Sequence, residues 1–291
     1  MLDSLQIGDF TFQWGSRTYV MGILNITPDS FSGDGLAGND LDRILDQARE
    51  FVEAGADVLD VGGESTRPGA EAVPVSAELD RVLPVVELLS RELDILISID
   101  TYKAEVAARA LEAGADLVND VWALRGDPGL VDLVSARDVP VILMHNRSDP
   151  ANAQIKEQLG GRYVGVEYQD LLTDVKHELL ESVAIARDAG ISDQKIILDP
   201  GIGFGKTVSQ NLELLDRLDE IRDLGFPVLL GPSRKSFIGY TLDLPPDDRV
   251  EGTGATIAVG ITRGADIVRI HDVREMVRVA RMTDAIVRRS G

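Results

Sequence analysis

The sequence contains no cysteine, so it can form no disulfide, no thiolate metal site and no cysteine nucleophile. Lysine is also scarce, with 6 residues among the 29 basic side chains. Acidic side chains number 49, and the resulting net charge of −20 repels nucleic acid and anionic membrane surfaces. We therefore expect no nucleic-acid partner. We also expect any bound anion to require that the few cations gather at one site.

Long apolar runs are missing too. No segment approaches about 18 uninterrupted apolar residues, so no membrane span and no membrane partner are predicted. The first residues, MLDSLQIGDF, lack the basic and apolar regions of a signal peptide, which favours a cytoplasmic protein. With 291 residues, 44% of them apolar, the chain can bury a full core. We predict one domain over 1–291 with a lead-in segment at 1–18.

Eight short, near-continuous apolar runs recur along the chain, as expected of strands covered on both faces. Amphipathic helical patterns separate them, for example at 40–57 and 211–225. The motif EAGAD occurs twice and RGAD once, and each places a helix-ending glycine about two residues before a strand. The runs lie at 19–26, 57–63, 95–101, 116–121, 140–146, 195–201, 227–233 and 266–272.

This alternation predicts an α/β fold, a single (β/α)8 TIM barrel. A doubly wound open sheet is the alternative, but no strand carries its glycine fingerprint. Long loops are expected after the first and second strands, at 27–40 and 62–76. The connection after the fifth strand is extended, and we interpret 147–168 within it as a long loop.

The segment DPGIGFGKT at 199–207 looks like a phosphate-binding loop but lacks its spacing. Pro200 stands where a P-loop needs its first glycine, and proline offers no N–H. The glycines are spaced two and two, which also fails the dinucleotide pattern. We therefore interpret Lys206 as an ordinary loop lysine, and the role of Asp199 has to come from elsewhere.

Polar side chains follow almost every predicted strand. In a TIM barrel the carboxyl ends of the strands build the active site. Any one of these residues could be a helix cap or a turn residue, but carboxylates, cations and amides together on one rim are too many for that role. The three histidines are scattered, without zinc-ligand spacing. The strand ends carry Asn25, Glu64 to Arg67, Asp100, Asn119, Asp120, His145, Asn146, Asp199, Ser233 to Ser236, Arg269 and His271.

These residue types suit a flat heterocycle with a phosphorylated arm. Asp100 and Asp199 can each accept two adjacent N–H donors from a ring edge. Arg269 can stack on an aromatic ring or bind phosphate, and Lys235 can reach a ring carbonyl or a leaving group. Asn25 offers a hard oxygen that could share Mg²⁺ with substrate phosphates.

The motif series between residues 22 and 272 resembles that of the dihydropteroate synthases, in the same order: GILNITPDSFSGDG, DVGGESTRPGA, SIDTYK, VND, LMHN, ILDPGIGFGKT, GPSRKSF and RIHD. The resemblance implies a TIM-barrel enzyme of folate biosynthesis. Such an enzyme joins p-aminobenzoate to 6-hydroxymethyl-7,8-dihydropterin pyrophosphate and releases pyrophosphate. It also implies Mg²⁺ as cofactor, a homodimer, a sulfonamide target, and a dissociative route through a pterin-methyl cation.

The resemblance further implies a role for each matching residue. Catalytic roles fall to Asp100, Lys235, Arg269 and His271. Pyrophosphate contacts fall to Asn25, Arg67, Arg269 and His271, with Asn25 also ligating the metal. The p-aminobenzoate pocket is assigned to Thr66, Arg67, Pro68 and Ser236. The pterin contacts are Asp100, Asn119, Met144, Asp199, Phe204, Lys235 and Arg269.

The chain departs from the commonest family pattern in two places. MHNRSDPAN follows the fifth strand instead of Met-His-Met, and the acidic residue after SFS comes one place later, at Asp34. Two alternatives stay open. One is a pterin-binding barrel of the methyltetrahydrofolate–corrinoid methyltransferase type, against which ESTRPG and SRKSF speak. The other is a Schiff-base aldolase that uses Lys235.

Overall fold

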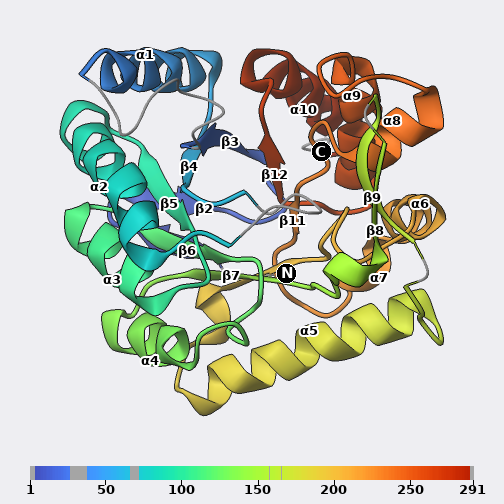
Figure 1. Cartoon of the computed structure of the whole chain (residues 1–291), viewed down its shortest axis with the longest axis horizontal. Helices are drawn as coiled ribbons and strands as arrows, with labels where there is room; N and C mark the ends of the chain where they lie inside the picture. Colours follow the sequence, from blue (N-terminus) through green and yellow to red (C-terminus); the bar gives the residue numbers. More distant parts are fainter. Residues whose placement is uncertain (1–3, 27–37, 66–71, 157, 165, 289–291) are drawn as a thin grey trace.

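An eight-stranded parallel sheet curls into a barrel at the centre of the molecule (Figure 1). The computed structural model describes residues 4–26, 38–65, 72–156, 158–164 and 166–288. Neighbouring strands run in the order β10-β7-β6-β5-β4-β3-β12-β11, and a parallel bridge from Leu198 to Val228 joins the two ends of the sheet. The predicted TIM barrel is confirmed, and the open sheet is excluded because these ends meet. The strands are β3 (Tyr19–Asn25), β4 (Val58–Gly62), β5 (Leu96–Asp100), β6 (Leu117–Asp120), β7 (Val141–Met144), β10 (Ile196–Asp199), β11 (Leu229–Leu230) and β12 (Ile267–Ile270).

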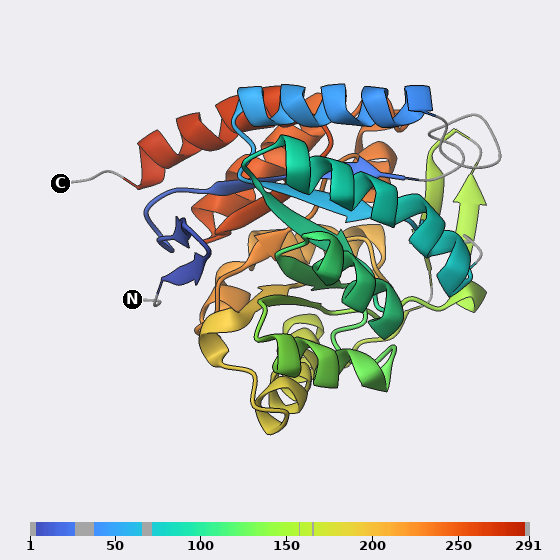
Figure 2. The same cartoon turned by 90° about the vertical axis from the view of Figure 1, so that its left-hand side faces the viewer.

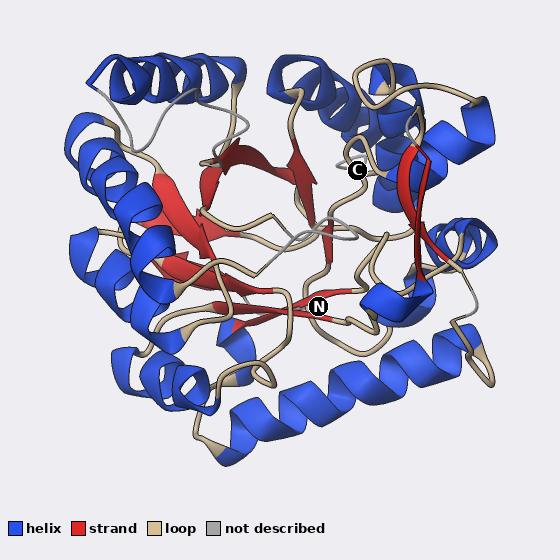
Figure 3. Cartoon of the chain, viewed as in Figure 1, coloured by secondary structure: helices blue, strands red, loops and turns tan. Residues whose placement is uncertain are grey.

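Helices cover the outside of the barrel, one or more after each strand (Figures 2 and 3). The glycines predicted to end helices have φ of +106° at Gly55, +112° at Gly114 and +101° at Gly264, a region that favours glycine. They turn the chain from a helix into the next strand. The principal helices are α1 (Gly38–Ala54), α2 (Val75–Glu92), α3 (Ala104–Ala113), α4 (Pro128–Arg137), α5 (Leu171–Asp188), α6 (Val208–Asp216), α9 (Val250–Thr262) and α10 (Val273–Val287).

The predicted lead-in segment forms an antiparallel hairpin of β1 (Leu5–Ile7) and β2 (Phe10–Phe12). Its apolar side chains pack against the interior residues at the amino ends of the barrel strands. Phe12 stacks on Trp14, with ring centroids 4.9 Å apart, and Tyr19 meets Phe12 edge-on at 4.7 Å. The hairpin therefore covers the amino end of the barrel, so we expect a ligand to enter at the carboxyl end, where TIM barrels place their active sites.

The connection between β7 and α5 holds a second hairpin, so the prediction of a plain long loop at 147–168 is wrong. A short 3-10 turn, Pro150–Asn152, leads into β8 (Ala153–Lys156), which pairs antiparallel with β9 (Gly160–Tyr163). The side chains of β8 are mostly exposed, so the strand lacks the apolar run by which buried strands are found. The hairpin lies beside α8 (Ser236–Leu242) at the carboxyl end of the barrel (Figure 1).

The helical pattern predicted over 211–225 is divided between α6 and a short α7 (Asp219–Arg222). Its apolar residues recur every three positions, whereas a helix turns once per about 3.6 residues, so the stripe drifts around a straight helix. Leu212 is accordingly exposed on α6, and the break after Asp216 brings Leu218 and Ile221 back into the core.

A 3-10 turn, Asp193–Lys195, precedes β10. Among the described residues, no helix is long and apolar enough to cross a bilayer. One domain over 1–291 stays a prediction.

Candidate functional site

The inside of the barrel changes from apolar to polar in one step along the strands. A lower layer packs against the amino-terminal hairpin and includes Val58, Leu96, Leu117, Ile142, Ile197, Leu229 and Ile267. Because every second residue of a strand points to the same face, the positions two residues further on face the same interior. These positions hold Asp60, Ser98, Asn119, Met144, Asp199, Gly231 and Arg269. The strand alternation thus builds a polar floor below the open end of the barrel.

Arg269 on β12 lies between Asp60 of this floor and Asp100, which stands one layer higher at the end of β5. Its Nε donates to Oδ2 of Asp60 at 2.5 Å, and its Nη2 donates to Oδ2 of Asp100 at 2.5 Å. Burial alone would lower the pKa of Arg269, but Asp60 and Asp100 raise it above the ordinary value. Burial raises the pKa of Asp100 to about 7, a rise that Arg269 opposes and Asp60 increases. The arginine is therefore firmly charged, while Asp100 titrates near neutral pH.

Asp199 ends β10 on the other side of the floor, and a cation and a ring lie beside it. Burial raises the pKa of Asp199 to about 6, against the opposing effects of the Gly201 N–H and of the Lys235 charge. The Gly201 N–H donates to Oδ1 of Asp199 at 2.7 Å. Lys235, at the start of α8, places Nζ 4.0 Å from the centroid of the Phe204 ring. The predicted pterin contacts Asp199, Phe204 and Lys235 therefore lie together.

An apolar wall borders the polar floor. Met144 at the end of β7 and Phe204 pack with Val121 in one buried cluster, against which Tyr102 and Trp122 lie. Met144 pairs with Asp199 across the neighbouring strands. A flat ring entering the barrel would therefore meet carboxylates at its edge and apolar side chains along its face. This is the combination of sparse polar groups on an apolar pocket that fixes the orientation of a small ligand.

A second polar group lies at the ends of β3 and β12, which are neighbours in the sheet. Nδ2 of Asn25 and Nε2 of His271 are 3.4 Å apart, and Nδ1 of His271 is 3.0 Å from Oγ of Ser233. The amide oxygen of Asn25 suits Mg²⁺ as a single protein ligand, because Mg²⁺ takes most of its ligands from phosphates and water. Within the described ranges, no three His, Asp or Glu side chains are arranged to hold a metal.

The glycines of DPGIGFGKT allow this loop to pack closely against neighbouring backbone. Gly201, Gly203 and Gly205 have φ of +70°, +84° and +59°. A Cβ on Gly201 would lie 1.8 Å from the carbonyl oxygen of His145, and one on Gly205 would lie 2.2 Å from the carbonyl carbon of Arg147. The loop after β10 is therefore pressed against the segment after β7. The P-loop interpretation rejected from spacing has no support in this geometry.

Lys206 is buried, so its interpretation as an ordinary loop lysine is wrong. Only 2% of the residue is exposed. Its Nζ donates to the carbonyl oxygens of Gly201 and Phe204 at 2.9 and 3.1 Å and lies 2.9 Å from Nδ1 of His145. Burial lowers the pKa of Lys206 to about 7. The lysine ties the loop that carries Asp199 and Phe204 to the end of β7, because three acceptors converge on one ammonium group.

Known proteins resemble this chain over nearly its whole length. A model of the pterin binding enzyme family matches residues 21–271. The dihydropteroate synthase of Clostridium beijerinckii is 49% identical over 286 residues, which cover 98% of this chain and 100% of that protein. The chain belongs to the pterin binding enzyme family.

Solved structures agree with this assignment. A dihydropteroate synthase from Clostridium difficile, crystallised in the presence of pteroic acid, has a TM-score of 0.87 at 49% identity, with 96% of this chain and 100% of that chain covered. The Yersinia pestis enzyme in a sulfonamide drug complex has a TM-score of 0.87 at 41% identity, with 98% and 99% covered. This pterin binding enzyme therefore carries the dihydropteroate synthase function of folate biosynthesis, a transfer of a pterin-methyl group. The methyltransferase and aldolase alternatives are set aside.

Two of the polar residues at the strand ends of this pterin binding enzyme serve the framework. Asp120 points away from the floor and accepts the N–H groups of Trp122 and Leu124 at 2.8 and 2.5 Å. Asn146 donates to the carbonyl oxygen of Val121 at 3.0 Å. These residues shape the turns after β6 and β7, as the ordinary behaviour of Asp and Asn at strand ends suggests.

Three of the four residues predicted for the p-aminobenzoate pocket fall in the stretch 66–71. Thr66, Arg67, Pro68 and Asp34 lie outside the described residues, and Ser236, half-buried, begins α8 directly after Lys235. Glu64 and Val73 lie on either side of 66–71, and both bind the ammonium group of Lys103. Nζ of Lys103 donates to Oε2 of Glu64 and to the carbonyl oxygen of Val73, each at 2.5 Å, and it also binds Glu78.

Asp60 is the functional-site residue that sequence reasoning missed. Asp60 does not stand at the end of its strand but lies inside the apolar run DVLDVGG. The alternation of side chains along the strand could have identified it, since Asp60 stands two residues after Val58 and so faces the same interior.

A cavity of about 400 Å³ lies at the other end of the barrel. Its lining side chains Arg17 and Asp57 already bind each other, with 2.6 Å between Nη2 and Oδ1, so it is not the candidate site.

Proposed function

We propose that the polar floor binds the pterin ring of 6-hydroxymethyl-7,8-dihydropterin pyrophosphate and that p-aminobenzoate attacks its methylene carbon. The observation that carries this proposal is the convergence of Asp100, Asn119 and Asp199 beside an apolar wall. Ionised carboxylates and an amide oxygen match the adjacent N–H donors of a pterin edge. Lys235 offers its ammonium group to a ring carbonyl, and Met144 and Phe204 cover a ring face.

Asn25, Arg269 and His271 are the proposed pyrophosphate contacts, with Arg67 as a further contact. The distance of 3.4 Å between Asn25 and His271 supports a common role at the rim. Asn25 would supply the one protein ligand to Mg²⁺, and the ion would offset the negative charge of the departing pyrophosphate. Arg269 and His271 would donate hydrogen bonds to the same oxygens. The arylamine pocket, assigned to Thr66, Arg67, Pro68 and Ser236, also stays a proposal.

The proposed mechanism is dissociative and needs no nucleophile from the protein. The C–O bond to pyrophosphate breaks first, and the electron pair leaves with the pyrophosphate oxygen. The carboxylates of Asp100 and Asp199 stabilise the electron-poor pterin-methyl cation. The arylamine nitrogen then forms the new C–N bond and loses a proton. The buried floor keeps water away from the cation, which water would otherwise capture.

Isotope scrambling tests this order of bond changes. Pterin pyrophosphate labelled with ¹⁸O in the C–O–P bridge is incubated with enzyme and Mg²⁺ in the absence of p-aminobenzoate. Reversible ionisation should move label into the non-bridging oxygens of recovered substrate. A parallel series of ring-substituted p-aminobenzoates should give a kcat that is insensitive to amine nucleophilicity. Fixed label together with a kcat that rises steeply with nucleophilicity would overturn the dissociative route.

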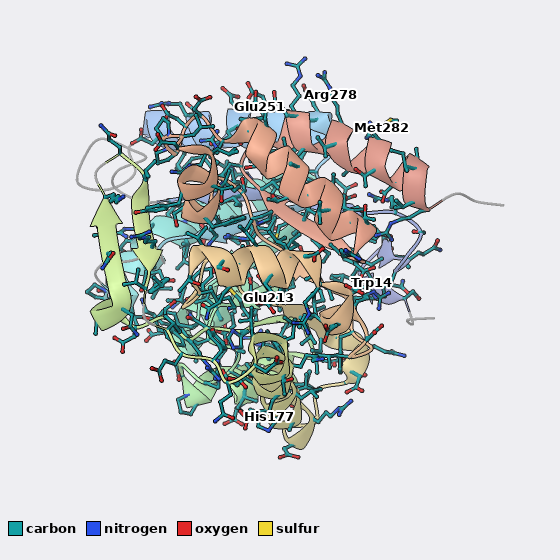
Figure 4. All side chains as sticks on the ribbon, turned by 90° about the vertical axis from the view of Figure 1, so that its right-hand side faces the viewer. Trp14, His177, Glu213, Glu251, Arg278 and Met282 are labelled. Atoms are coloured by element: carbon teal, nitrogen blue, oxygen red, sulfur yellow. The ribbon has the colours of Figure 1, made fainter. Side chains whose placement is uncertain are left out.

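We infer that the enzyme is a homodimer and that α6, α9 and α10 form the interface. Figure 4 shows this face, with Glu213 on α6, Glu251 on α9 and Met282 on α10. Large exposed apolar side chains gather on these helices, and such patches mark protein interfaces. They are Leu212, Val259, Met282 and Ile286, with exposures of 42%, 44%, 63% and 52%.

Light scattering at micromolar concentration tests the interface. Wild type should show the mass of a dimer, and Met282→Glu should shift it toward the monomer. Leu180→Glu is the matched control, because Leu180 is an exposed leucine on α5, outside the proposed interface. A monomeric wild type would contradict the proposal.

A cytoplasmic location stays a prediction.

A further inference from the structure

Asp60 and Asp100 hold the same arginine from different depths of the barrel. The Asp60 side chain is 0% exposed, and it accepts from Nε of Arg269 at 2.5 Å. Asp100 stands one polar layer higher, at the end of β5, and accepts from Nη2 at 2.5 Å. Gly62, the partner of Asp100 in the neighbouring strand, has no side chain to cover it. Only Asp100 of the two can therefore reach a ligand in the open end.

Asp60 also fixes the orientation of an amide. Nδ2 of Asn119 lies 3.4 and 3.3 Å from the two carboxylate oxygens of Asp60. Because a carboxylate only accepts hydrogen bonds, the NH₂ group of Asn119 must face Asp60. Its amide oxygen then faces away, toward the pocket, where it can accept a ring N–H. One buried carboxylate thus orients two of the residues assigned to the pterin.

We propose that Asp60 is a positioning residue that serves as the permanent anion of Arg269, so that Asp100 can exchange Arg269 for the N–H donors of the pterin. This inference rests on the proposed pterin contacts. Without Asp60, a ligand that engaged Asp100 would strip Arg269 of its carboxylate partner inside the protein, which is strongly unfavourable. With Asp60 in place, Arg269 keeps a partner throughout and remains aimed at the pyrophosphate arm.

Asp60→Asn is the direct test, because it preserves shape and removes the charge. Calorimetry with 6-hydroxymethylpterin should show an affinity at least tenfold weaker, since the released Arg269 binds Asp100 more tightly. Asp57→Asn is the matched control. Asp57 adjoins the same strand, binds Arg17 with 2.6 Å between Oδ1 and Nη2, and lies at the closed end. It should leave the affinity for the pterin within twofold of wild type.

The pH dependence separates positioning from general structural damage. The charges that act on Asp100 are Arg269, Asp60, Glu78 and Lys235, and the charge of Asp60 raises its pKa. Removing that charge lowers the pKa of Asp100. The acidic limb of the pterin affinity profile should therefore move to lower pH in Asp60→Asn and stay in place in Asp57→Asn. An unshifted limb with an affinity within twofold of wild type would overturn the inference.

A second variant keeps the inference testable if Asp60→Asn does not fold. Asp100→Asn should weaken pterin binding but leave the affinity for Mg²⁺-pyrophosphate unchanged or tighter, because Asp60 still holds Arg269. Equal losses for both ligands would show that Asp100 is the anchor, and the inference would fail. If wild type binds no pterin at any pH, the proposed function itself fails. If wild type binds it and Asp60→Asn matches wild type, only the role of Asp60 is lost.

Discussion

Asp199 shows how a single residue gains its role from its position. Asparagine or aspartate at a strand end is most often a turn residue, and Asp199 does accept the Gly201 N–H. It is also the last residue of β10, on the interior face and only 6% exposed. Burial there raises its pKa to about 6. The same residue thus shapes a turn and offers a carboxylate to a ligand.

Asp199→Asn should therefore reduce pterin affinity while the fold remains intact. Loss of a charged acceptor in a shielded site costs about 2–3 kcal/mol, or roughly 30- to 150-fold in affinity. Calorimetry with 6-hydroxymethylpterin measures the effect. Asp193→Asn is the control, because Asp193 binds Arg187 on the exposed surface with 2.6 Å between Oδ2 and Nη2. An affinity for Asp199→Asn within twofold of wild type would remove Asp199 from the site.

Lys206→Met should destabilise the enzyme, since it leaves two carbonyl oxygens and the Nδ1 atom of His145 without their donor. An unsatisfied buried acceptor costs about 1–3 kcal/mol. Lys176→Met removes only a partly exposed ion pair with Glu220, whose Nζ–Oε2 distance is 2.7 Å, and should cost about 0–1 kcal/mol. Urea denaturation at pH 7 measures both changes. Equal stability of the two variants would contradict the buried role of Lys206.

The pH dependence of stability provides an independent test of Lys206. Its pKa falls from 10.5 to about 7 on folding. Between these values the unfolded chain binds the proton and the folded enzyme does not, so the free energy of unfolding rises with pH. This contribution should vanish in Lys206→Met, which makes its stability profile flatter than that of wild type between pH 7 and 10.5. Parallel profiles would mean that the lysine is not buried as described.

At the scale of elements, one buried arginine anchors the turn of the β8–β9 hairpin. Arg249 donates to the carbonyl oxygen of Leu159 at 3.0 Å, of Arg234 at 2.9 Å and of Leu244 at 2.9 Å. Burial lowers its pKa. Gly239 makes room for it, because a Cβ there would lie 2.0 Å from Nη2 of Arg249. The arginine thus joins the hairpin to the loop that carries Lys235.

Arg249→Met should release the hairpin and cost about 1–3 kcal/mol for the carbonyl groups left without partners. Limited proteolysis should then cut within 153–163 at an enzyme concentration that leaves wild type intact. Arg187→Met removes the exposed pair with Asp193 and a cation–π contact with Phe226, both outside the hairpin, and is the control. Identical cleavage of the two variants would show that Arg249 does not hold the hairpin.

The elements that the sequence revealed are those with a strong local signal. The barrel strands are covered on both faces and read as apolar runs, and glycines with positive φ mark helix ends. The β8–β9 hairpin lacks such a run because the side chains of β8 are mostly exposed and those of β9 are mostly half-buried. Lys206 was misjudged for a related reason. Its burial comes from contact with His145, which is distant in sequence, and local spacing carries no trace of that contact.

At the scale of the whole molecule, the barrel explains why motifs spread over 22–272 act together. The strand ends meet at one rim, so Arg269 binds Asp60 and Asp100, which lie 209 and 169 positions before it in the sequence. The resemblance supplied the roles of the rim residues. The alternation of inward-facing and outward-facing side chains along β4 would have identified Asp60, which lies below the rim. The enzyme has a net charge of −20 and few cationic side chains. Two of them, Arg269 and Lys235, lie where the anionic substrate is proposed to bind.

The enzyme is expected to make dihydropteroate from the two substrates that the carboxyl end of its barrel is proposed to bind. The most direct measurement mixes purified enzyme, Mg²⁺, 6-hydroxymethyl-7,8-dihydropterin pyrophosphate and p-aminobenzoate and follows the products by mass spectrometry. Dihydropteroate and pyrophosphate should appear in equal amounts, only when both substrates are present, and far more slowly with Asp199→Asn. Absence of dihydropteroate from folded wild-type enzyme, or equal rates for wild type and Asp199→Asn, would contradict the account.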